Sequence, residues 1–377
     1  MAVYLDHNAT TPLLPAAREA MTTALEAGGN PSSVHGAGRA ARATVEAARA
    51  AVAELVCAFP AEVIFTSGGS EANALAIRGA AAANGVKGIL IGETEHESVL
   101  VNALDAVKPG MVFRTIGVDR SGVLDLGVLD KGLAVCGGPA LVSVMAANNE
   151  TGVIAPVAEI ARRVKAAGGL FHLDAAQAAG RISLNLRDLG ADMMTISSHK
   201  MGGPQGAGAL IVRDGVKLTR QIAGGGQELG RRAGTENVAA IAGFGAAAAQ
   251  GADWSKIAIL RDRLEKALLA AMPQAVIHGA GASRLPNTTL IGLAGVAGET
   301  QMMAMDLAGF AVSSGAACSS GKVKTSHVLA AMGVQAAGDA IRVSLGPDTT
   351  QAEIDAFVTA WSAFAARALS RRTAEAA

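Results

Sequence analysis

The sequence predicts an α/β protein in which a mostly parallel sheet, covered by helices on both faces, is followed by a smaller α+β domain. From about residue 60, short β-rich runs alternate with Ala-rich segments of helical pattern, which is typical of a parallel sheet. Near residue 237 this alternation gives way to two long helical segments and a few short strands. We therefore expect a large domain over residues 12–250 and a small domain over 251–377 that also includes 1–11.

The individual elements follow from the same patterns. Helices are expected at 15–27 and 37–57, before the sheet, and at 238–250, 254–272, 299–307 and from 351 onward. Continuous apolar runs predict buried strands of the large sheet. These are 62–66, 88–92, 111–118, 141–147, 170–174 and 193–198, and 209–213 could add one more, with an antiparallel direction as one option. In the smaller domain, strands are expected at 275–279, 288–293 and 340–345.

The composition excludes several classes of protein. The 377 residues include 32 Lys and Arg against 32 Asp and Glu, so no net field attracts nucleic acid or an anionic membrane surface. Aromatic residues make up only 3%, which disfavours base stacking. The most apolar stretch, residues 237–252, is mostly Ala and Gly and is too short to span a bilayer. We expect neither a nucleic-acid partner nor a membrane location.

Cysteine usage indicates the compartment. Cys57, Cys136 and Cys318 are an odd number, lie far apart and form no CxxC pair, so a disulfide framework or a zinc module is not expected. The first residues contain no basic segment followed by an apolar one, so no signal peptide is visible. The sequence therefore predicts a cytoplasmic protein without an intrinsic metal site.

A glycine-rich turn follows the first strand of the predicted sheet. Gly69 and Ser70 lie between that strand and a helix, where free backbone N–H groups and the helix N-terminus can bind an anion such as phosphate. The alternative is an ordinary turn in which a serine caps the helix.

Polar residues also follow two later strands. Asp174 ends an apolar strand and Gln177 comes three residues later; the carboxylate could cap the next helix or hold a positively charged ligand atom. Ser197, His199 and Lys200 follow the next strand and precede a glycine-rich loop. A lysine there could be an ordinary surface cation or a Schiff-base nucleophile.

Together these features supply what pyridoxal 5'-phosphate (PLP) requires. The turn would hold the phosphate, the carboxylate would protonate the pyridine nitrogen, and the lysine would bind the aldehyde. Because the carboxyl ends of the strands of an open α/β sheet form the ligand crevice, we expect these groups to meet there.

Four further residues are candidates. His96 could lie over a cofactor ring and move protons, or could cap a helix. Asn149 could bond the ring hydroxyl or a substrate carboxylate, and Arg342 could clamp that carboxylate or be structural. Cys318 lies in a Gly- and Ser-rich loop where a thiol has no packing role, and Lys322 and Lys324 could favour its thiolate or be solvated.

The motifs YLDHNATTP, TSGGSEANALAI, TEHESVL, NNETGVIAP, HLDAAQ, SSHKMGGPQGAGAL, GGGQELGRRAGTENV, SSGAACSSG and AIRVSLG occur in order along nearly the whole chain. In these motifs the sequence resembles the cysteine desulfurases, relatives of class V aminotransferases with the type I PLP fold. The resemblance is to the group that serves nitrogen fixation and general iron–sulfur assembly.

This resemblance implies a role for each candidate. It makes Lys200 the PLP-binding lysine, His96 the ring-stacking proton carrier and Cys318 the acceptor of the substrate sulfur, as a persulfide, as well as a possible transient cluster ligand. The phosphate, the ring and the substrate would be held by the others: Gly69, Ser70, Ser197, His199 and, from the second subunit of a homodimer, Thr235 for phosphate; Asp174 and Gln177 for the ring; Asn149 and Arg342 for the carboxylate of L-cysteine.

The resemblance also implies a partner, an iron–sulfur scaffold or another sulfur-acceptor protein. Two departures bear on that partner. Many close relatives have Gly-Ser-Ala-Cys where this chain has Gly-Ala-Ala-Cys, followed here by Lys-Val-Lys-Thr, and the chain ends soon after its last helix. The competing interpretations are a selenocysteine lyase or another class V PLP lyase or aminotransferase, and a non-catalytic scaffold of the same fold. Lys200 and Cys318 argue against a scaffold, which needs neither.

Overall fold

The computed structural model describes residues 2–314 and 325–375. Within these ranges the largest sheet has the strand order β2-β8-β7-β6-β5-β3-β4. Its strands are β2 (Val63–Thr66), β3 (Gly88–Gly92), β4 (Val112–Ile116), β5 (Ala140–Met145), β6 (Leu170–Asp174), β7 (Met193–Ser197) and β8 (Gly208–Val212). The strand β8 is antiparallel to both neighbours, whereas β4, β3, β5, β6 and β7 pair in parallel. The predicted mostly parallel sheet is confirmed, and the added strand is antiparallel.

Helices cover both faces of this sheet, because side chains of successive strand residues point to opposite faces. On one face Leu90, Val142 and Leu173 pack in a cluster with α2, α6, α7 and α8, and on the other Ile89, Ile91 and Leu141 pack with α3, α4 and α5. The helices in the larger part of the chain are α1 (Pro15–Ala27), α2 (Gly36–Leu55), α3 (Gly69–Ala74), α4 (Ala80–Ala83), α5 (Glu97–Ala106), α6 (Leu126–Val135), α7 (Val157–Ala166) and α8 (Val238–Ala249). A π-helical segment, Leu75–Gly79, joins α3 to α4.

The C-terminal third forms a separate sheet with the order β12-β13-β10-β9, all antiparallel. Its elements are α9 (Trp254–Ala271), β9 (Val276–His278), β10 (Thr288–Gly292), α10 (Gly298–Leu307), β11 (Phe310–Ala311), β12 (Ser313–Ser314), α11 (His327–Ala331), β13 (Ala340–Ser344) and α12 (Gln351–Glu375). The predicted helix starts at residues 254 and 351 match α9 and α12.

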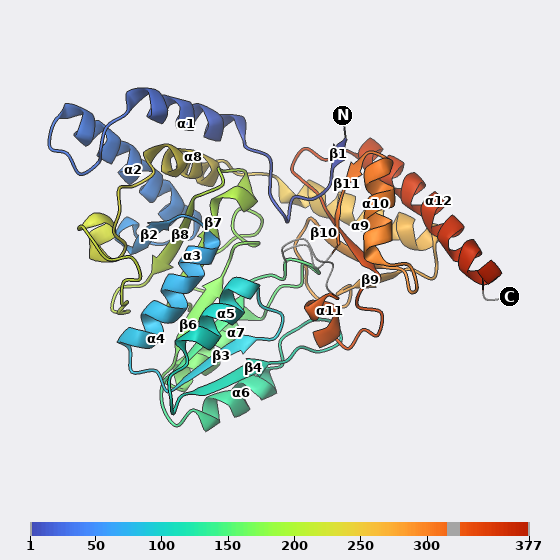
Figure 1. Cartoon of the computed structure of the whole chain (residues 1–377), viewed down its shortest axis with the longest axis horizontal. Helices are drawn as coiled ribbons and strands as arrows, with labels where there is room; N and C mark the ends of the chain where they lie inside the picture. The colour runs from blue at the N-terminus through green and yellow to red at the C-terminus, as the bar shows by residue number, and fades with distance from the viewer. Residues whose placement is uncertain (1, 315–324, 376–377) are drawn as a thin grey trace.

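The first residues of the chain lie with this C-terminal part (Figure 1). The strand β1 (Val3–Tyr4) pairs in parallel with β11, and Leu5 is buried in a core cluster with Phe357 and Trp361 of α12. The N-terminal segment then crosses to the large sheet, where α1 begins. This second core supports the proposed division into residues 12–250 and 251–377 with 1–11, which stays a prediction. None of the described helices is long and apolar enough to cross a membrane.

Candidate active site

A cavity of about 330 Å³ lies at the carboxyl ends of the central strands. It brings together side chains from β5, β6 and β7, from the first turns of α3 and α5, and from the N-terminal segment. Most of the residues singled out in the sequence line it: Gly69, Ser70, His96, Asn149, Asp174, Gln177, Ser197, His199 and Lys200. Their meeting follows from the parallel sheet, because the strands that precede them end at the same edge.

The anion-binding end of the cavity is built on close backbone packing. Gly68 has φ 155°, and a Cβ at Gly208 on β8 would come 2.6 Å from its carbonyl carbon. A Cβ at Gly69 would lie 3.3 Å from Cβ of Ser197, so the turn and the end of β7 are in contact. The N-cap of α3 is Gly68 and no side chain caps the helix, which leaves the serine-cap alternative without support; Gly69 and Ser70, the first residues of α3, line the cavity.

Asp174 lines the cavity at the end of β6. Its Oδ1 accepts a hydrogen bond from the backbone N–H of Ala176 (3.0 Å), and its Oδ2 accepts one from Nδ2 of Asn73 (2.8 Å). It therefore caps the following turn and also lines the cavity; that it holds a positively charged ligand atom stays a prediction. The Oδ1 atom of Asn73 is buried and has no partner within the described part of the chain.

A buried arginine orients Gln177. Arg181 donates to Gln177 Oε1 (2.5 Å), which directs Gln177 Nε2 to the backbone oxygen of Asn8 (2.9 Å). Burial and the nearby Arg342 lower the pKa of Arg181 to about 9. Its described hydrogen bonds all go to neutral oxygens, including the backbone oxygens of His7 and Lys200, so it stiffens the wall behind the cavity.

Lys200 is held by the N-terminal segment. Its Nζ donates to the backbone oxygens of Asn8 (2.6 Å) and Ala9 (2.8 Å). The neighbouring His199 shares a hydrogen bond between Nδ1 and Thr10 Oγ1 (3.2 Å). Burial, followed by the cations of Lys200 and Arg181, lowers the pKa of His199 to about 4. At neutral pH His199 is an uncharged hydrogen-bonding group, suited to an anion only as a donor.

His96 begins α5 and lines the cavity. Its Nδ1 accepts the backbone N–H of Ser98 at 3.1 Å and lies 2.8 Å from Ser98 Oγ. The His96 imidazole therefore both caps α5 and lines the cavity. The adjacent Glu95 is fully buried, and burial raises its pKa well above the usual range.

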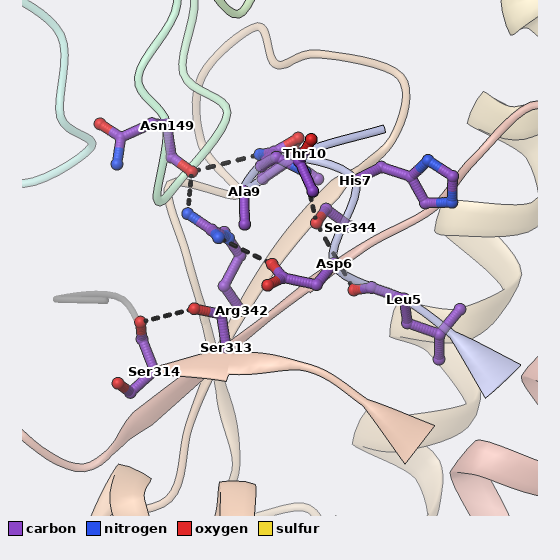
Figure 2. Close-up of polar contacts among 12 residues, drawn as sticks. Leu5, Asp6, His7, Ala9, Thr10, Asn149, Ser313, Ser314, Arg342 and Ser344 are labelled. Atoms are coloured by element: carbon purple, nitrogen blue, oxygen red, sulfur yellow. Dashed lines mark hydrogen bonds and ion pairs between the residues drawn. The ribbon is translucent and has the colours of Figure 1, made fainter. Parts of the chain in front are cut away.

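Asn149 and Arg342 meet at the junction with the C-terminal part (Figure 2). The Nη1 of Arg342 donates to the backbone oxygen of Asn149 (2.9 Å), and Nη2 forms an ion pair with Asp6 Oδ1 (2.8 Å). The side-chain amide of Asn149 points away from Arg342 in this view. Arg342 is 1% exposed and does not line the cavity, so its predicted contact with a substrate carboxylate stays a prediction.

Among the predicted site residues that the structure describes, Arg342 and Thr235 do not line the cavity. Thr235 is exposed, and Cys318 lies outside the described residues together with Lys322 and Lys324. The described residues contain no group of three or more His, Cys, Asp or Glu side chains placed to hold a metal ion.

Sequence reasoning missed Asn8, Asn73, Ser98 and Arg181. A usable signal existed for two of them. Asn73 follows Ser70 by three residues on the same helix, and Arg181 follows Gln177 by four, so each pair shares a helical or turn face. Asn8 gave no such signal, because the residues that it contacts are far away in the sequence.

The donor set fits PLP. An anion could be met by Ser197 and neutral His199 beside the turn at Gly69, a pyridine nitrogen by Asp174, and an aldehyde by Lys200, and all of these residues line the same cavity. The unpartnered Oδ1 of Asn73 is a further buried acceptor that a bound group could satisfy.

The fold and this cavity define a protein of the α/β class in which a lysine, a carboxylate and an anion-binding turn meet at the strand ends. The aminotransferase class-V family model matches residues 3–357. Among curated proteins, the chain is 46% identical to a cysteine desulfurase of Cereibacter sphaeroides, covering 94% of this chain and 93% of the relative. It is 40% identical to the cysteine desulfurase IscS of Dictyoglomus turgidum, covering 94% and 92%.

Solved structures agree. A NifS-like protein from Rickettsia africae is 37% identical and superposes with a TM-score of 0.87, covering 96% of this chain and 99% of that one. Another NifS-like protein is 33% identical, also with a TM-score of 0.87, over 97% and 99%. The chain belongs to the class-V aminotransferase family, and the predicted fold class is confirmed.

Proposed function

We propose that this protein is a PLP-dependent cysteine desulfurase that converts L-cysteine to L-alanine and a persulfide on Cys318. The observation that carries the proposal is the single cavity in which Lys200, Asp174 and His96 meet beside the turn at Gly69. Relatives named cysteine desulfurase at 40–46% identity over 94% of the chain support the choice of reaction.

PLP, when bound, would supply an electron sink that makes the Cα proton and the Cβ–S bond of cysteine labile. Lys200 would hold the cofactor and release it to the substrate amine, and the backbone oxygens of Asn8 and Ala9 position its Nζ before that exchange. Asp174 would hold the ring nitrogen in its protonated form, which is the form that accepts electrons.

The sulfur would leave to a thiolate. Cys318 attacks the substrate sulfur, an S–S bond forms while the Cβ–S bond breaks, and the carbon fragment takes up protons to become alanine. The anionic end of L-cysteine would be met by Asn149, which lines the cavity, and by Arg342, whose guanidinium touches the Asn149 backbone. The role of Cys318 in this reaction rests on the sequence alone, because Cys318 lies outside the described residues.

Activity and colour test the proposal. Wild type should be yellow and should form alanine from cysteine. Lys200→Ala should lose the PLP absorbance, and Cys318→Ser should keep the colour but lose persulfide transfer. Lys165→Ala and Cys57→Ser, which change an exposed lysine and an exposed cysteine outside the cavity, are the matched controls. A colourless wild type, or full desulfurase activity in Cys318→Ser, would refute the proposal.

The main alternative is a selenocysteine lyase. Comparing kcat/KM for cysteine and selenocysteine separates the two, because a lyase that does not use Cys318 would favour selenocysteine and would be insensitive to Cys318→Ser. A non-catalytic scaffold would leave both substrates unchanged.

We also propose a homodimer in which Thr235 contributes to the phosphate site of the other subunit. Thr235 is exposed and is not among the residues that line the cavity of its own chain, which supports a role in another subunit. Mixing an inactive Lys200→Ala chain with a Thr235→Val chain of reduced activity should raise activity above the sum of the two. No gain on mixing would argue against shared sites.

The acceptor of the sulfur is proposed to be an iron–sulfur scaffold or another sulfur-acceptor protein in the cytoplasm, with Cys318 as a possible transient cluster ligand. Transfer of labelled sulfur from the Cys318 persulfide to candidate acceptors would test this.

A further inference from the structure

A chain of hydrogen bonds runs along one wall of the cavity from Asp174 to His96. Nδ2 of Asn73 donates to Asp174 Oδ2 at 2.8 Å and also lies 2.9 Å from Ser98 Oγ, and Ser98 Oγ lies 2.8 Å from His96 Nδ1. Three elements contribute, since Asn73 comes from α3, Ser98 and His96 from the start of α5, and Asp174 from β6. All four residues line the cavity.

The direction of each hydrogen bond follows from which atoms can donate. A flipped Asn73 amide would place its oxygen against Asp174 Oδ2, and two acceptors would repel, so the nitrogen faces the carboxylate. The amide nitrogen has two hydrogens, and the second is directed to Ser98 Oγ. Ser98 Oγ therefore accepts from Asn73, and its own hydrogen remains available for His96 Nδ1, which already accepts the backbone N–H of Ser98.

His96 Nδ1 thus faces two donors. One is the Ser98 hydroxyl, and the other is the Ser98 backbone N–H at 3.1 Å, which cannot act as an acceptor. A hydrogen on Nδ1 would have to displace both of these donors, so the two together hold Nδ1 as an acceptor. A neutral imidazole then carries its hydrogen on Nε2.

We propose that Asn73 and Ser98 are positioning residues that hold His96 in its neutral Nε2–H form and tie that form to the carboxylate of Asp174. In this state His96 Nε2 carries a hydrogen and can act only as a donor. To accept a proton at Nε2 it must first carry its hydrogen on Nδ1, where two donors oppose it. The inference rests on the proposed function for its meaning in catalysis, but the tautomer itself does not depend on activity.

The Asp174 charge is part of the arrangement. A carboxylate polarises the Asn73 amide, and the polarised amide makes the Ser98 hydroxyl a stronger donor, since neighbouring hydrogen bonds in a chain strengthen one another. Asp174 would face the ring nitrogen of PLP, and His96 would stack on the ring. Hydrogen bonds through Asn73 and Ser98 therefore link these two residues.

The test reads the tautomer directly. The full-length protein with ¹⁵N-labelled histidine is examined by long-range ¹H–¹⁵N spectroscopy, with and without PLP, and His96 is assigned through His96→Asn. Wild type should show a hydrogen-free Nδ1 and a protonated Nε2. Ser98→Ala, which keeps the backbone N–H but removes the hydroxyl, should shift His96 toward a mixture of tautomers, and Ser98→Thr should restore the wild-type spectrum.

Two further variants complete the design. Asn73→Ala should change the spectrum in the same direction as Ser98→Ala. Asn102→Ala is the matched control, because Asn102 donates to the backbone oxygen of Ser98 (2.7 Å) and takes no part in the hydrogen bonds that link Asp174 to His96. Desulfurase kcat should fall about five- to tenfold in Ser98→Ala, as expected for loss of one hydrogen bond, with Ser98→Thr restoring it.

A protonated Nδ1 in wild type, or an unchanged His96 tautomer in Ser98→Ala, would overturn the proposal. If Asn73→Ala does not fold, the Ser98 pair decides alone. The spectrum is also recorded on protein without PLP, so it tests the tautomer independently of activity. A wild type that forms no alanine would refute the proposed function without deciding the tautomer.

Discussion

The fully buried His172 on β6 predicts an acid-sensitive step in stability. Its Nδ1 shares a hydrogen bond with Ser143 Oγ (2.8 Å) and its Nε2 shares one with Thr195 Oγ1 (2.9 Å). Both partners are neutral, and Asp174 is the charged group that acts on the imidazole within the described part of the chain. Burial lowers its pKa to about 4, against 6.5 in an unfolded chain. Between these two pH values the unfolded state binds the extra proton.

The sign and size follow from this difference. Stability is retained above pH 6.5 and is lost as the pH falls toward 4, because the proton binds the unfolded chain first. For pKa values of about 6.5 and about 4, the loss from one histidine between pH 7 and pH 5 is about 2 kcal/mol. Burial also lowers the pKa of His7 and His199 to about 4, so the wild type should lose more than this.

The variant His172→Gln isolates the contribution. The free energy of unfolding, measured by urea titration and far-ultraviolet circular dichroism at pH 7, 6 and 5, should fall by about 2 kcal/mol less in the variant than in wild type. His35→Gln, a change at an exposed histidine, should fall as the wild type does. If His172→Gln shows the full wild-type loss at pH 5, the reasoning about burial is refuted.

Two other changes probe the scaffold of the site. Glu228→Gln removes the buried bidentate carboxylate of Arg49 (2.7 and 2.9 Å) and leaves this guanidinium with the half-exposed Glu46 (3.2 Å) as its remaining described ion pair. Unfolding at pH 7 should become easier by about 3 kcal/mol, and unchanged stability would contradict this. Gly208→Ala would place a Cβ 2.6 Å from the Gly68 backbone and should weaken PLP binding in an absorbance titration, whereas Gly251→Ala, with open space around it, should not. Equal dissociation constants for the two glycine variants would count against the close-packing argument.

Much of the site could be predicted from sequence because its residues are carried by local patterns. Asp174 and Lys200 each follow an apolar strand, and parallel strands that end at one edge bring such residues together. Gly69 and His96 were predicted to lie at this edge for the same reason, because each follows an apolar strand. The sequence did not decide whether β8 is parallel or antiparallel to its neighbours, because an apolar run alone does not indicate strand direction.

The rest of the site depends on contacts between distant residues. Asn8 reaches Lys200 and Gln177 through its backbone oxygen, and nothing in its neighbourhood along the chain indicates either contact. Arg342 was expected at a substrate carboxylate, yet in the structure its partners are Asp6 and the Asn149 backbone. A residue pattern predicts that a charge will need a partner, but not which partner the fold supplies.

The position of Asn8 also orders events during synthesis. Its backbone oxygen receives Lys200, while its side chain bonds Asn287 (3.0 Å) and Thr288 (2.9 Å) and its N–H bonds Ser344 (3.0 Å). Asn8 is among the first residues made, whereas Asn287, Thr288 and Ser344 belong to the C-terminal third of the chain. The lysine can be fully held only after almost the whole chain has left the ribosome, so a truncated chain can build its large sheet and still lack a finished site.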